Sequence, residues 1–169
     1  MNNDGKSEDI KFQRPENKDI AGIFQIISQY SAKGLLLPMT QDDIVDRLDS
    51  FFIASYKDKA IACVSVRNFG DDLFELRSLA VKEDFTGRGI GGKLVAEIIN
   101  KTFADKQNDN IRLFALTYQV EFFKHLGFEV VEKSVFPQKI WSDCANCPKF
   151  SHCDEIAVQI SSALYKNFI

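Results

Sequence analysis

The densest chemical signal in the chain is a glycine-rich stretch, Gly87-Arg88-Gly89-Ile90-Gly91-Gly92-Lys93. Backbone N–H groups at the start of a helix bind phosphate oxygens, and glycines let a phosphate approach closely. Four glycines in six residues would make a costly turn without a ligand, because glycine loses more conformational freedom on folding than any other residue. Arg88 and Lys93 add positive charge. We therefore predict a phosphate-binding loop.

Three kinds of phosphate-binding loop fit this stretch in part. A P-loop needs Ser or Thr after Lys93, where this chain has Leu94. The dinucleotide fingerprint G-x-G-x-x-G fits Gly87, Gly89 and Gly92, but it normally follows the first strand directly, and here it comes after three consecutive antiparallel strands, five residues beyond the last of them. An acyl-coenzyme A loop shares the same physics without either conflict. A flexible strand-to-helix turn without a ligand is the remaining alternative.

Two charged side chains lie on the strand predicted over residues 73–81, just before the loop. Side chains alternate between the faces of a strand, so Glu75 and Arg77 share one face with Leu79. A carboxylate there could accept a proton from an incoming ammonium, as general base catalysis requires. An arginine could bind an acceptor carboxylate with two hydrogen bonds. Alternatively, Glu75 and Arg77 pair with each other or with Arg67 on a solvated face.

Three of the four cysteines, Cys144, Cys147 and Cys153, fall within ten residues of an irregular segment, 137–154. Tetrahedral zinc accepts sulfur and nitrogen together, and His152 or Asp154 offers a fourth ligand. Reduced cysteines without a metal fit the pattern equally well, and an iron–sulfur or redox role is a third alternative. If zinc binds, we expect it to stabilise the segment and not to take part in chemistry.

The hydrophobic pattern predicts the elements that position these residues. Their order is β α α β β β α β α β β. Three consecutive strands with short turns are antiparallel, whereas a strand–helix–strand crossover requires parallel pairing. We therefore expect an α/β (α+β) fold with a mixed sheet and helices on both faces. The predicted strands are 10–14, 51–56, 60–67, 73–81, 111–116, 128–131 and 156–160, and the predicted helices begin at Asn17, Thr40, Ile90 and Val120.

Length, charge and hydropathy exclude several classes of protein. A chain of 169 residues suits a single domain, 1–169, in which 137–154 is an insert before the last strand. The net charge of -3 argues against a nucleic-acid partner bound through bulk positive charge. No apolar run approaches the ~18 residues of a membrane span, and the polar start is unlike a signal peptide. We therefore expect a cytoplasmic protein without membrane or nucleic-acid partners.

Over residues 10–160 the chain resembles the GNAT superfamily of N-acetyltransferases. The resemblance rests on Leu79-Ala80-Val81, on the loop from Thr86 to Gly91, and on the stretch from Phe122 to Phe128. It implies a sheet that is splayed between its fourth and fifth strands, with the pantetheine arm of acetyl-CoA in the gap. Thr86 stands where the superfamily usually has Gln or Arg. The coenzyme contacts that the resemblance implies are Leu79, Ala80, Val81, Thr86, Gly87, Arg88, Gly89, Ile90, Gly91, Gly92 and Lys93.

A narrower resemblance is to the short, single-domain N-acetylglutamate synthases that begin arginine biosynthesis. It rests on residues 34–38, 75–81 and 113–118, and most specifically on 135–149 with its cysteines. It implies direct transfer of an acetyl group from acetyl-CoA to the α-amine of L-glutamate. Similar proteins often carry Arg after Leu37-Pro38, where this chain has Met39, so a different amine acceptor stays open. A non-catalytic acyl-CoA-binding module is the third hypothesis.

The resemblance also implies roles for single residues. Glu75 is the expected base, and Arg77, Lys33 and Leu37 are the expected contacts of the acceptor. Many superfamily members use a tyrosine as the acid that protonates the leaving thiolate, at the position where this chain has Phe123. Tyr118 is the nearest substitute, with solvent or a packing role for Tyr118 as alternatives. A homodimer is compatible with this family.

Overall fold

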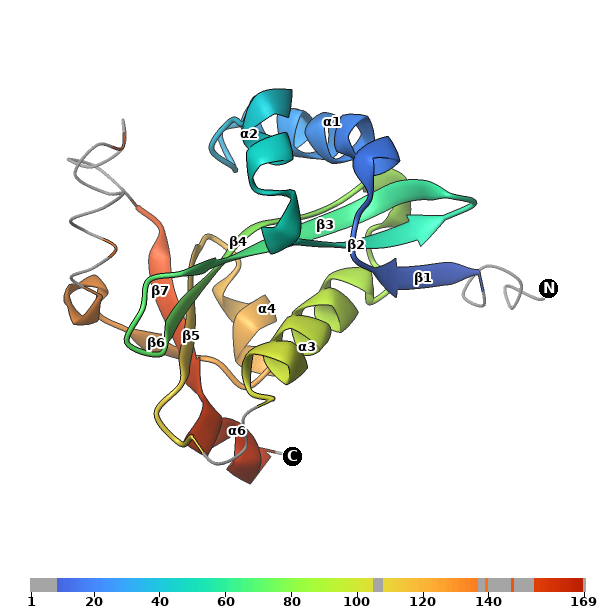
Figure 1. The fold of residues 1–169 in the computed structure, drawn as a ribbon. Helices are drawn as coiled ribbons and strands as arrows, with labels where there is room; N and C mark the ends of the chain where they lie inside the picture. Colours follow the sequence, from blue (N-terminus) through green and yellow to red (C-terminus); the bar gives the residue numbers. More distant parts are fainter. Residues whose placement is uncertain (1–8, 105–107, 137–138, 140–146, 148–153, 169) are drawn as a thin grey trace. The chain divides into compact units, whose positions relative to one another are not determined.

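The computed structural model describes residues 9–104, 108–136, 139, 147 and 154–168. Its elements follow the predicted order, and a C-terminal helix, α6 (Ser162–Phe168), is added to it (Figure 1). Contacts group the chain into two compact units. The first unit comprises Met1–Val66 and Ser78–Ile98, and the second comprises Arg67–Arg77 and Ile99–Ile169.

Seven strands of the described residues form one mixed sheet in the order β1-β2-β3-β4-β5-β7-β6. Neighbours pair antiparallel at β1–β2, β2–β3, β5–β7 and β6–β7, and β4 pairs parallel with β5. This confirms the mixed sheet expected from the crossover. The strands are β1 (Ile10–Gln13), β2 (Phe51–Tyr56), β3 (Lys59–Asn68), β4 (Leu73–Val81), β5 (Arg112–Thr117), β6 (Glu129–Val131) and β7 (Ile156–Ser161).

The parallel ladder between β4 and β5 is short. It pairs Leu73, Phe74 and Glu75 with three successive residues of β5 that end at Phe114. By contrast, β5 and β7 pair along their whole length, from Arg112 to Thr117. Among the described residues, the β4–β5 ladder therefore ends at Glu75, which is where the expected splay begins.

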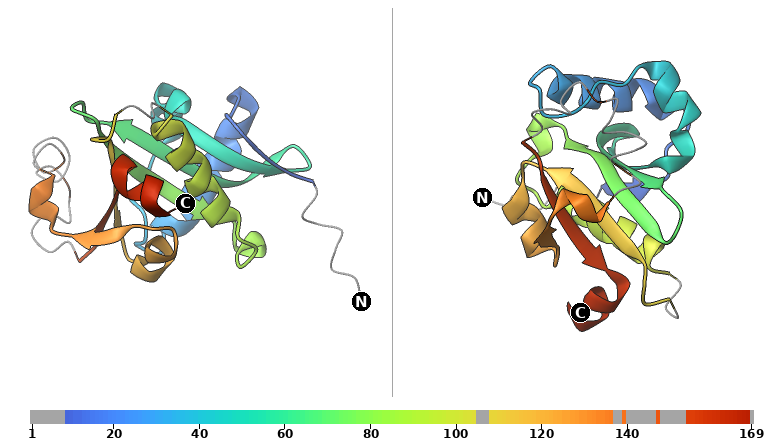
Figure 2. Two further views of the ribbon diagram at one scale, coloured as in Figure 1. Left: turned by 90° about the horizontal axis from the view of Figure 1, so that it is seen from below. Right: turned by 90° about the vertical axis from the view of Figure 1, so that its left-hand side faces the viewer.

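In the first unit, helices cover both faces of β2 and β3 (Figures 1 and 2). Helices α1 (Ile20–Ser31) and α2 (Gln41–Asp46) lie on one side and α3 (Ile90–Thr102) on the other. Five successive residues of β2 are therefore buried, where a half-exposed strand would alternate. The core between β2 and the first two helices contains Ile23, Ile26, Ile27, Ile44, Phe51, Ile53, Ala60, Cys63 and Ala80.

The start of α2 follows from two residues. The Thr40 hydroxyl accepts a hydrogen bond from the Asp43 N–H at 3.0 Å, and the Asp43 carboxylate accepts one from the Thr40 N–H at 2.8 Å. These bonds stabilise the charged form of Asp43 and lower its pKa. The reciprocal pair is a capping box, which confirms the N-terminus predicted at Thr40.

Strand β4 does not alternate evenly. Ser78 has a φ of 52°, in the left-handed region that side chains other than glycine rarely adopt. One such residue inside a strand interrupts the two-residue repeat. The sequence predicts a single face shared by Glu75, Arg77, Leu79 and Val81, and the structure corrects this, because the alternation breaks at Ser78.

The second unit is built on β5, β7 and β6, with the short helix α4 (Val120–His125) in contact with β6 and β7. Its core cluster consists of Leu73, Phe114, Phe136 and Ala157. Phe123 of α4 packs edge-on against Phe128, with 5.1 Å between the ring centroids. None of the helices in the described part of the chain has the length and apolar character needed to cross a membrane.

Candidate functional site

The glycine-rich loop lies in the first unit, between the 3-10 turn Glu83–Phe85 and α3. Gly87 and Gly89 both have a φ of 76°, a conformation that glycine adopts without strain. A Cβ added at either position would meet no described atom within 4 Å. The backbone conformation therefore favours glycine here, while the space around either Cβ position is open.

Helix α3 begins directly after the loop. Gly91 and Gly92 lie in its first turn, where backbone N–H groups have no acceptor within the helix. The first bond from the loop into the helix runs from the Lys93 N–H to the Gly89 carbonyl, at 3.1 Å. The N–H groups at the positive end of this 13-residue helix are of the kind that binds phosphate oxygens, so coenzyme binding here stays a prediction.

Thr86 and Arg88 are both bonded back to the 3-10 turn. The Thr86 hydroxyl donates to the Glu83 carbonyl at 2.8 Å. Arg88 donates from Nη2 to the Asp84 carbonyl at 2.9 Å, and its guanidinium lies 4.9 Å from the centroid of the Phe85 ring. Thr86 thus closes the turn, while the Arg88 charge is fixed at an exposed place beside the loop.

Helix α1 contacts the end of β4 through a hydroxyl group. Tyr30 donates a hydrogen bond to the Val81 carbonyl at 2.5 Å, and burial raises the pKa of Tyr30. Lys33, one turn further on, forms an ion pair with Glu83, which raises the pKa of Lys33. The sequence assigned no partner to Tyr30. Its place on the apolar face of the helix predicted from Asn17 was the available signal, because a buried hydroxyl usually has a partner.

The left-handed residue of β4 is in contact with two sulfur-containing side chains. The Ser78 carbonyl accepts a hydrogen bond from the Cys63 thiol at 3.4 Å, and the Ser78 hydroxyl lies 3.9 Å from Met39 Sδ. Cys63 is fully buried, which raises the pKa of its thiol to about 12. Cys63 therefore belongs to the core of the first unit.

In the second unit, a buried carboxylate lies between two cations. The Glu75 side chain is 5% exposed, and its Oε1 lies 3.0 Å from Nζ of Lys139, which is 8% exposed. The other oxygen, Oε2, lies 3.6 Å from Nε of Arg77. The pairing of Glu75 with Arg77 was one of the two alternatives in the sequence, but the face is buried and not solvated.

Sequence reasoning missed Lys139. The signal available was a Gln138-Lys139 pair between Phe136-Pro137 and Ile140-Trp141, because a cation in mostly apolar surroundings often has a buried partner. Phe136 shows how the lysine is positioned. Its ring stacks on that of Phe114, and its carbonyl accepts the Lys139 N–H at 3.1 Å.

Tyr118 follows β5 and is bonded to the other end of the insert. Its hydroxyl donates to Asp154 Oδ1 at 2.8 Å, and about a third of the side chain is exposed. The candidate acid is thus hydrogen-bonded to a carboxylate that follows the cysteine segment. Its role in proton transfer stays a prediction.

The cysteine cluster lies mostly outside the described residues. Cys144, His152 and Cys153 are not among the described residues. Cys147 is described, and it is partly buried. Among the residues that are described, no group of three His, Cys, Asp or Glu side chains could bind a metal ion. The zinc alternative therefore stays a prediction.

The predicted site residues fall into two groups. Leu79 to Val81, the loop 86–93, Lys33 and Leu37 belong to the first unit, where Leu37 is exposed. Glu75, Arg77 and Tyr118 belong to the second unit, where Arg77 contacts Glu75. Strand β4 supplies residues to both groups.

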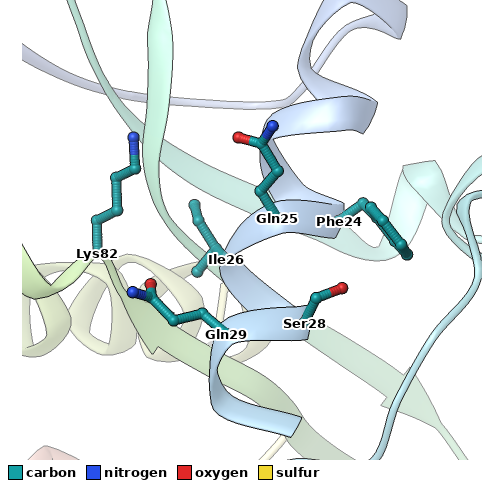
Figure 3. Close-up of a pocket in the computed structure, with 6 residues that line it drawn as sticks. All are labelled: Phe24, Gln25, Ile26, Ser28, Gln29 and Lys82. Carbon is teal, nitrogen blue, oxygen red and sulfur yellow. The ribbon is translucent and has the colours of Figure 1, made fainter. Parts of the chain in front are cut away.

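A pocket of about 460 Å³ lies against α1 (Figure 3). One face of the helix forms most of its wall, and Lys82 supplies the one charged side chain of that lining. The lining contains no carboxylate and no nucleophile, so we give the pocket no part in catalysis. The lining residues are Phe24, Gln25, Ile26, Ser28, Gln29 and Lys82.

Comparison with known proteins identifies the family. Residues 47–130 match the model of the acetyltransferase (GNAT) domain. An uncharacterized N-acetyltransferase of Chlorobaculum tepidum is 39% identical over 140 residues, which are 83% of this chain and 88% of that protein. An amino-acid acetyltransferase of Mycobacterium tuberculosis is 28% identical over 134 residues, which are 78% of this chain and 75% of that protein.

A solved structure shows the same fold. The N-acetylglutamate synthase of Neisseria gonorrhoeae, complexed with coenzyme A and N-acetyl-glutamate, matches 90% of this chain with a TM-score of 0.79 and 22% identity. This chain spans 35% of that longer protein. The glycine-rich loop before α3, the mixed sheet and the similarity to these relatives lead to one conclusion: this chain belongs to the GNAT family of acetyltransferases.

Proposed function

We propose that this protein transfers the acetyl group of acetyl-CoA to the α-amine of L-glutamate, by direct attack in a ternary complex. The observation that carries the proposal is the buried Glu75 carboxylate between Lys139 and Arg77, on the strand that leads into the coenzyme loop. L-Glutamate carries one ammonium group and two carboxylates. The Glu75 carboxylate complements the ammonium group, and the neighbouring cations complement the carboxylates. The reaction is the first step of arginine biosynthesis in the synthases that this chain resembles.

The loop and the start of α3 bind the coenzyme in this proposal. The N–H groups at Ile90 to Gly92 bind pyrophosphate oxygens, and Arg88 adds charge. The backbone of Leu79 to Val81 pairs with the pantetheine arm as a neighbouring strand would. Tyr30 supports that backbone, because its hydroxyl is bonded to the Val81 carbonyl.

The acceptor reacts only as a free amine. It arrives as an ammonium, and Glu75 accepts the proton directly or through a water molecule. The nitrogen then attacks the thioester carbon, forming the C–N bond, and a backbone N–H near Val81 stabilises the negative charge on oxygen. The C–S bond breaks, the attacking nitrogen loses its second proton to solvent, and the leaving thiolate takes a proton from solvent or from Tyr118, which is then reprotonated by solvent. Arg77 binds an acceptor carboxylate, with Lys33 and Leu37 as further contacts.

A specific observation favours a second candidate. Met39 stands where similar proteins often carry Arg, and its sulfur lies next to Ser78 of β4. A thioether gives no charge to bind a second carboxylate, so the acceptor would be another amino acid, a polyamine or a peptide N-terminus. The chemistry at Glu75 would be unchanged.

Consumption of acetyl-CoA against a panel of amines tests these proposals. The panel contains L-glutamate, L-glutamine, L-aspartate, L-leucine, spermidine and a short peptide. Preferred turnover of L-glutamate supports the first proposal, and turnover of other amines but not of glutamate supports the second. Tight coenzyme binding without turnover of any amine would contradict both and indicate a non-catalytic acyl-CoA-binding module.

A further inference from the structure

The β4–β5 ladder places Glu75 beside Phe114. The two residues are register partners in this parallel pair, so their side chains project from the same face. Phe136 stacks on Phe114, with 3.9 Å between the ring centroids and 12° between the planes. Lys139 lies three residues further on, and its Nζ is 3.0 Å from the Glu75 carboxylate. Glu75 and Phe114 are thus neighbours on the sheet, and each is contacted by one of two residues that are close in sequence, Lys139 and Phe136.

We propose that Lys139 is a positioning residue, which keeps the Glu75 carboxylate ionised and oriented so that it can accept the proton of the acceptor. This inference rests on the proposed function. Lys139 acts through Glu75, and the Phe136–Phe114 stack fixes the segment from which it projects. Lys139 and Glu75 form a buried ion pair, and the anion of this pair, Glu75, is also the proposed general base.

The burial of both side chains gives the pair its effect. Ion pairs on the surface contribute little, since water screens them and the side chains are mobile. Here the two side chains are 8% and 5% exposed. Burial disfavours the charged form of a carboxylate, whereas a cation at this distance favours that form. Arg77 also faces Glu75, at 3.6 Å, but it is farther away and more exposed than Lys139, so removal of Lys139 leaves the weaker of the two cations. A protonated Glu75 could not accept a proton from the acceptor.

Substitutions at position 139 separate charge from packing. Lys139→Met keeps an unbranched side chain of similar length and removes the charge. Lys139→Arg keeps the charge. Lys124→Met is the matched control, because Lys124 also pairs with a glutamate, Glu121 at 3.5 Å, but on an exposed surface of the same unit.

The first measurement is kcat/KM for the acceptor between pH 5 and 9. In Lys139→Met the acidic limb of the profile moves to higher pH by about one unit or more, and at pH values on that limb kcat/KM falls about tenfold for each unit of the shift. Lys139→Arg restores the wild-type limb, and Lys124→Met leaves it unmoved. KM for acetyl-CoA stays unchanged in all three variants. Wild-type limbs in both Lys139 variants would overturn the inference.

The second measurement does not depend on turnover. The Glu75 carboxyl carbon is followed by NMR in protein with carbon-13-labelled glutamate, and Glu75→Gln assigns its resonance. Lys139→Met raises the pH at which this resonance titrates by about one unit or more, and Lys139→Arg does not. If no amine is acetylated, the proposed function fails, while this titration still decides the role of Lys139. If Lys139→Met does not fold, Lys139→Arg decides, since a titration shifted by a unit in that variant overturns the inference.

Discussion

The ring of Phe136 stacks on the ring of Phe114 at a centroid distance of 3.9 Å, and both side chains are fully buried. Phe114 belongs to the middle of the sheet, whereas Phe136 follows the last residue of β6 by five positions. The stack therefore fastens the segment after β6 to the centre of the second unit. Lys139 owes its place beside Glu75 to this contact.

Truncation of the stacked ring tests that anchoring. Phe136→Ala lowers the free energy of unfolding by about 3–5 kcal/mol, because it removes a buried aromatic side chain and leaves a cavity. Denaturant unfolding followed by circular dichroism measures the change. Val135→Ala is the control, since Val135 is exposed and its loss changes stability by less than about 0.5 kcal/mol. Equal effects of the two variants would contradict the anchoring role.

The role of Glu75 is tested by removal of its charge alone. Glu75→Gln lowers kcat about 10²–10⁴-fold at neutral pH, because the amide cannot accept the proton of the acceptor. Calorimetry shows an unchanged dissociation constant for coenzyme A. Glu121→Gln, which changes an exposed glutamate that also pairs with a lysine, keeps full activity. Wild-type turnover in Glu75→Gln would remove Glu75 from its role.

The glycine loop is tested by a pair of alanine substitutions. Gly89→Ala and Gly70→Ala both place a Cβ at a positive φ, 76° and 79°, with no described atom near it. Each loses roughly 1–2 kcal/mol of stability, because left-handed backbone is unfavourable for alanine. Binding of coenzyme A, measured by calorimetry, weakens only in Gly89→Ala. Equal binding by both variants would exclude the loop as the phosphate site.

The buried thiol of Cys63 makes stability depend on pH. Burial raises the pKa of Cys63 from 9.0 to about 12, so the native protein keeps this proton at a pH where the unfolded chain has lost it. The contribution to stability is fully present below pH 9 and declines as pH rises toward 12, by up to about 1.4 kcal/mol per unit.

Unfolding free energies at several pH values between 8 and 10.5 measure this effect. Wild-type protein loses stability faster with rising pH than Cys63→Ala, because the substituted chain has no thiol to ionise on unfolding. The difference in slope is the quantity of interest, so a constant loss of stability from the smaller side chain does not matter. Parallel slopes would mean that the thiol is not buried in solution.

Much of this fold could be predicted from hydrophobic period and turn residues. The bounds of β2 and β4 match the predicted strands, and the capping pair at Thr40 gives the start of α2. The loop at Gly87 and Gly89 was recognisable because positive φ values select glycine. These features are local, and a local sequence determines them.

The missed features join residues that are far apart in the chain. Lys139 contacts Glu75 across 64 positions, and Tyr30 contacts Val81 across 51. Neither hydrophobic periodicity nor motif spacing in a single sequence predicts a contact between residues so far apart in the chain. Ser78 was missed for a different reason. Its left-handed backbone is supported by contacts with Cys63 and Met39, not by its own preference.

The buried pair of Glu75 and Lys139 also has a consequence for how this family can change over time. A chain that loses the lysine keeps a buried glutamate whose remaining cation is the more distant and more exposed Arg77, and a chain that loses only the glutamate buries the lysine charge without this anion. Either single replacement is strongly unfavourable, whereas replacement of both together is tolerable. Positions 75 and 139 are therefore expected to co-vary among relatives that share this segment, and chains that carry only one of the two charges should be rare.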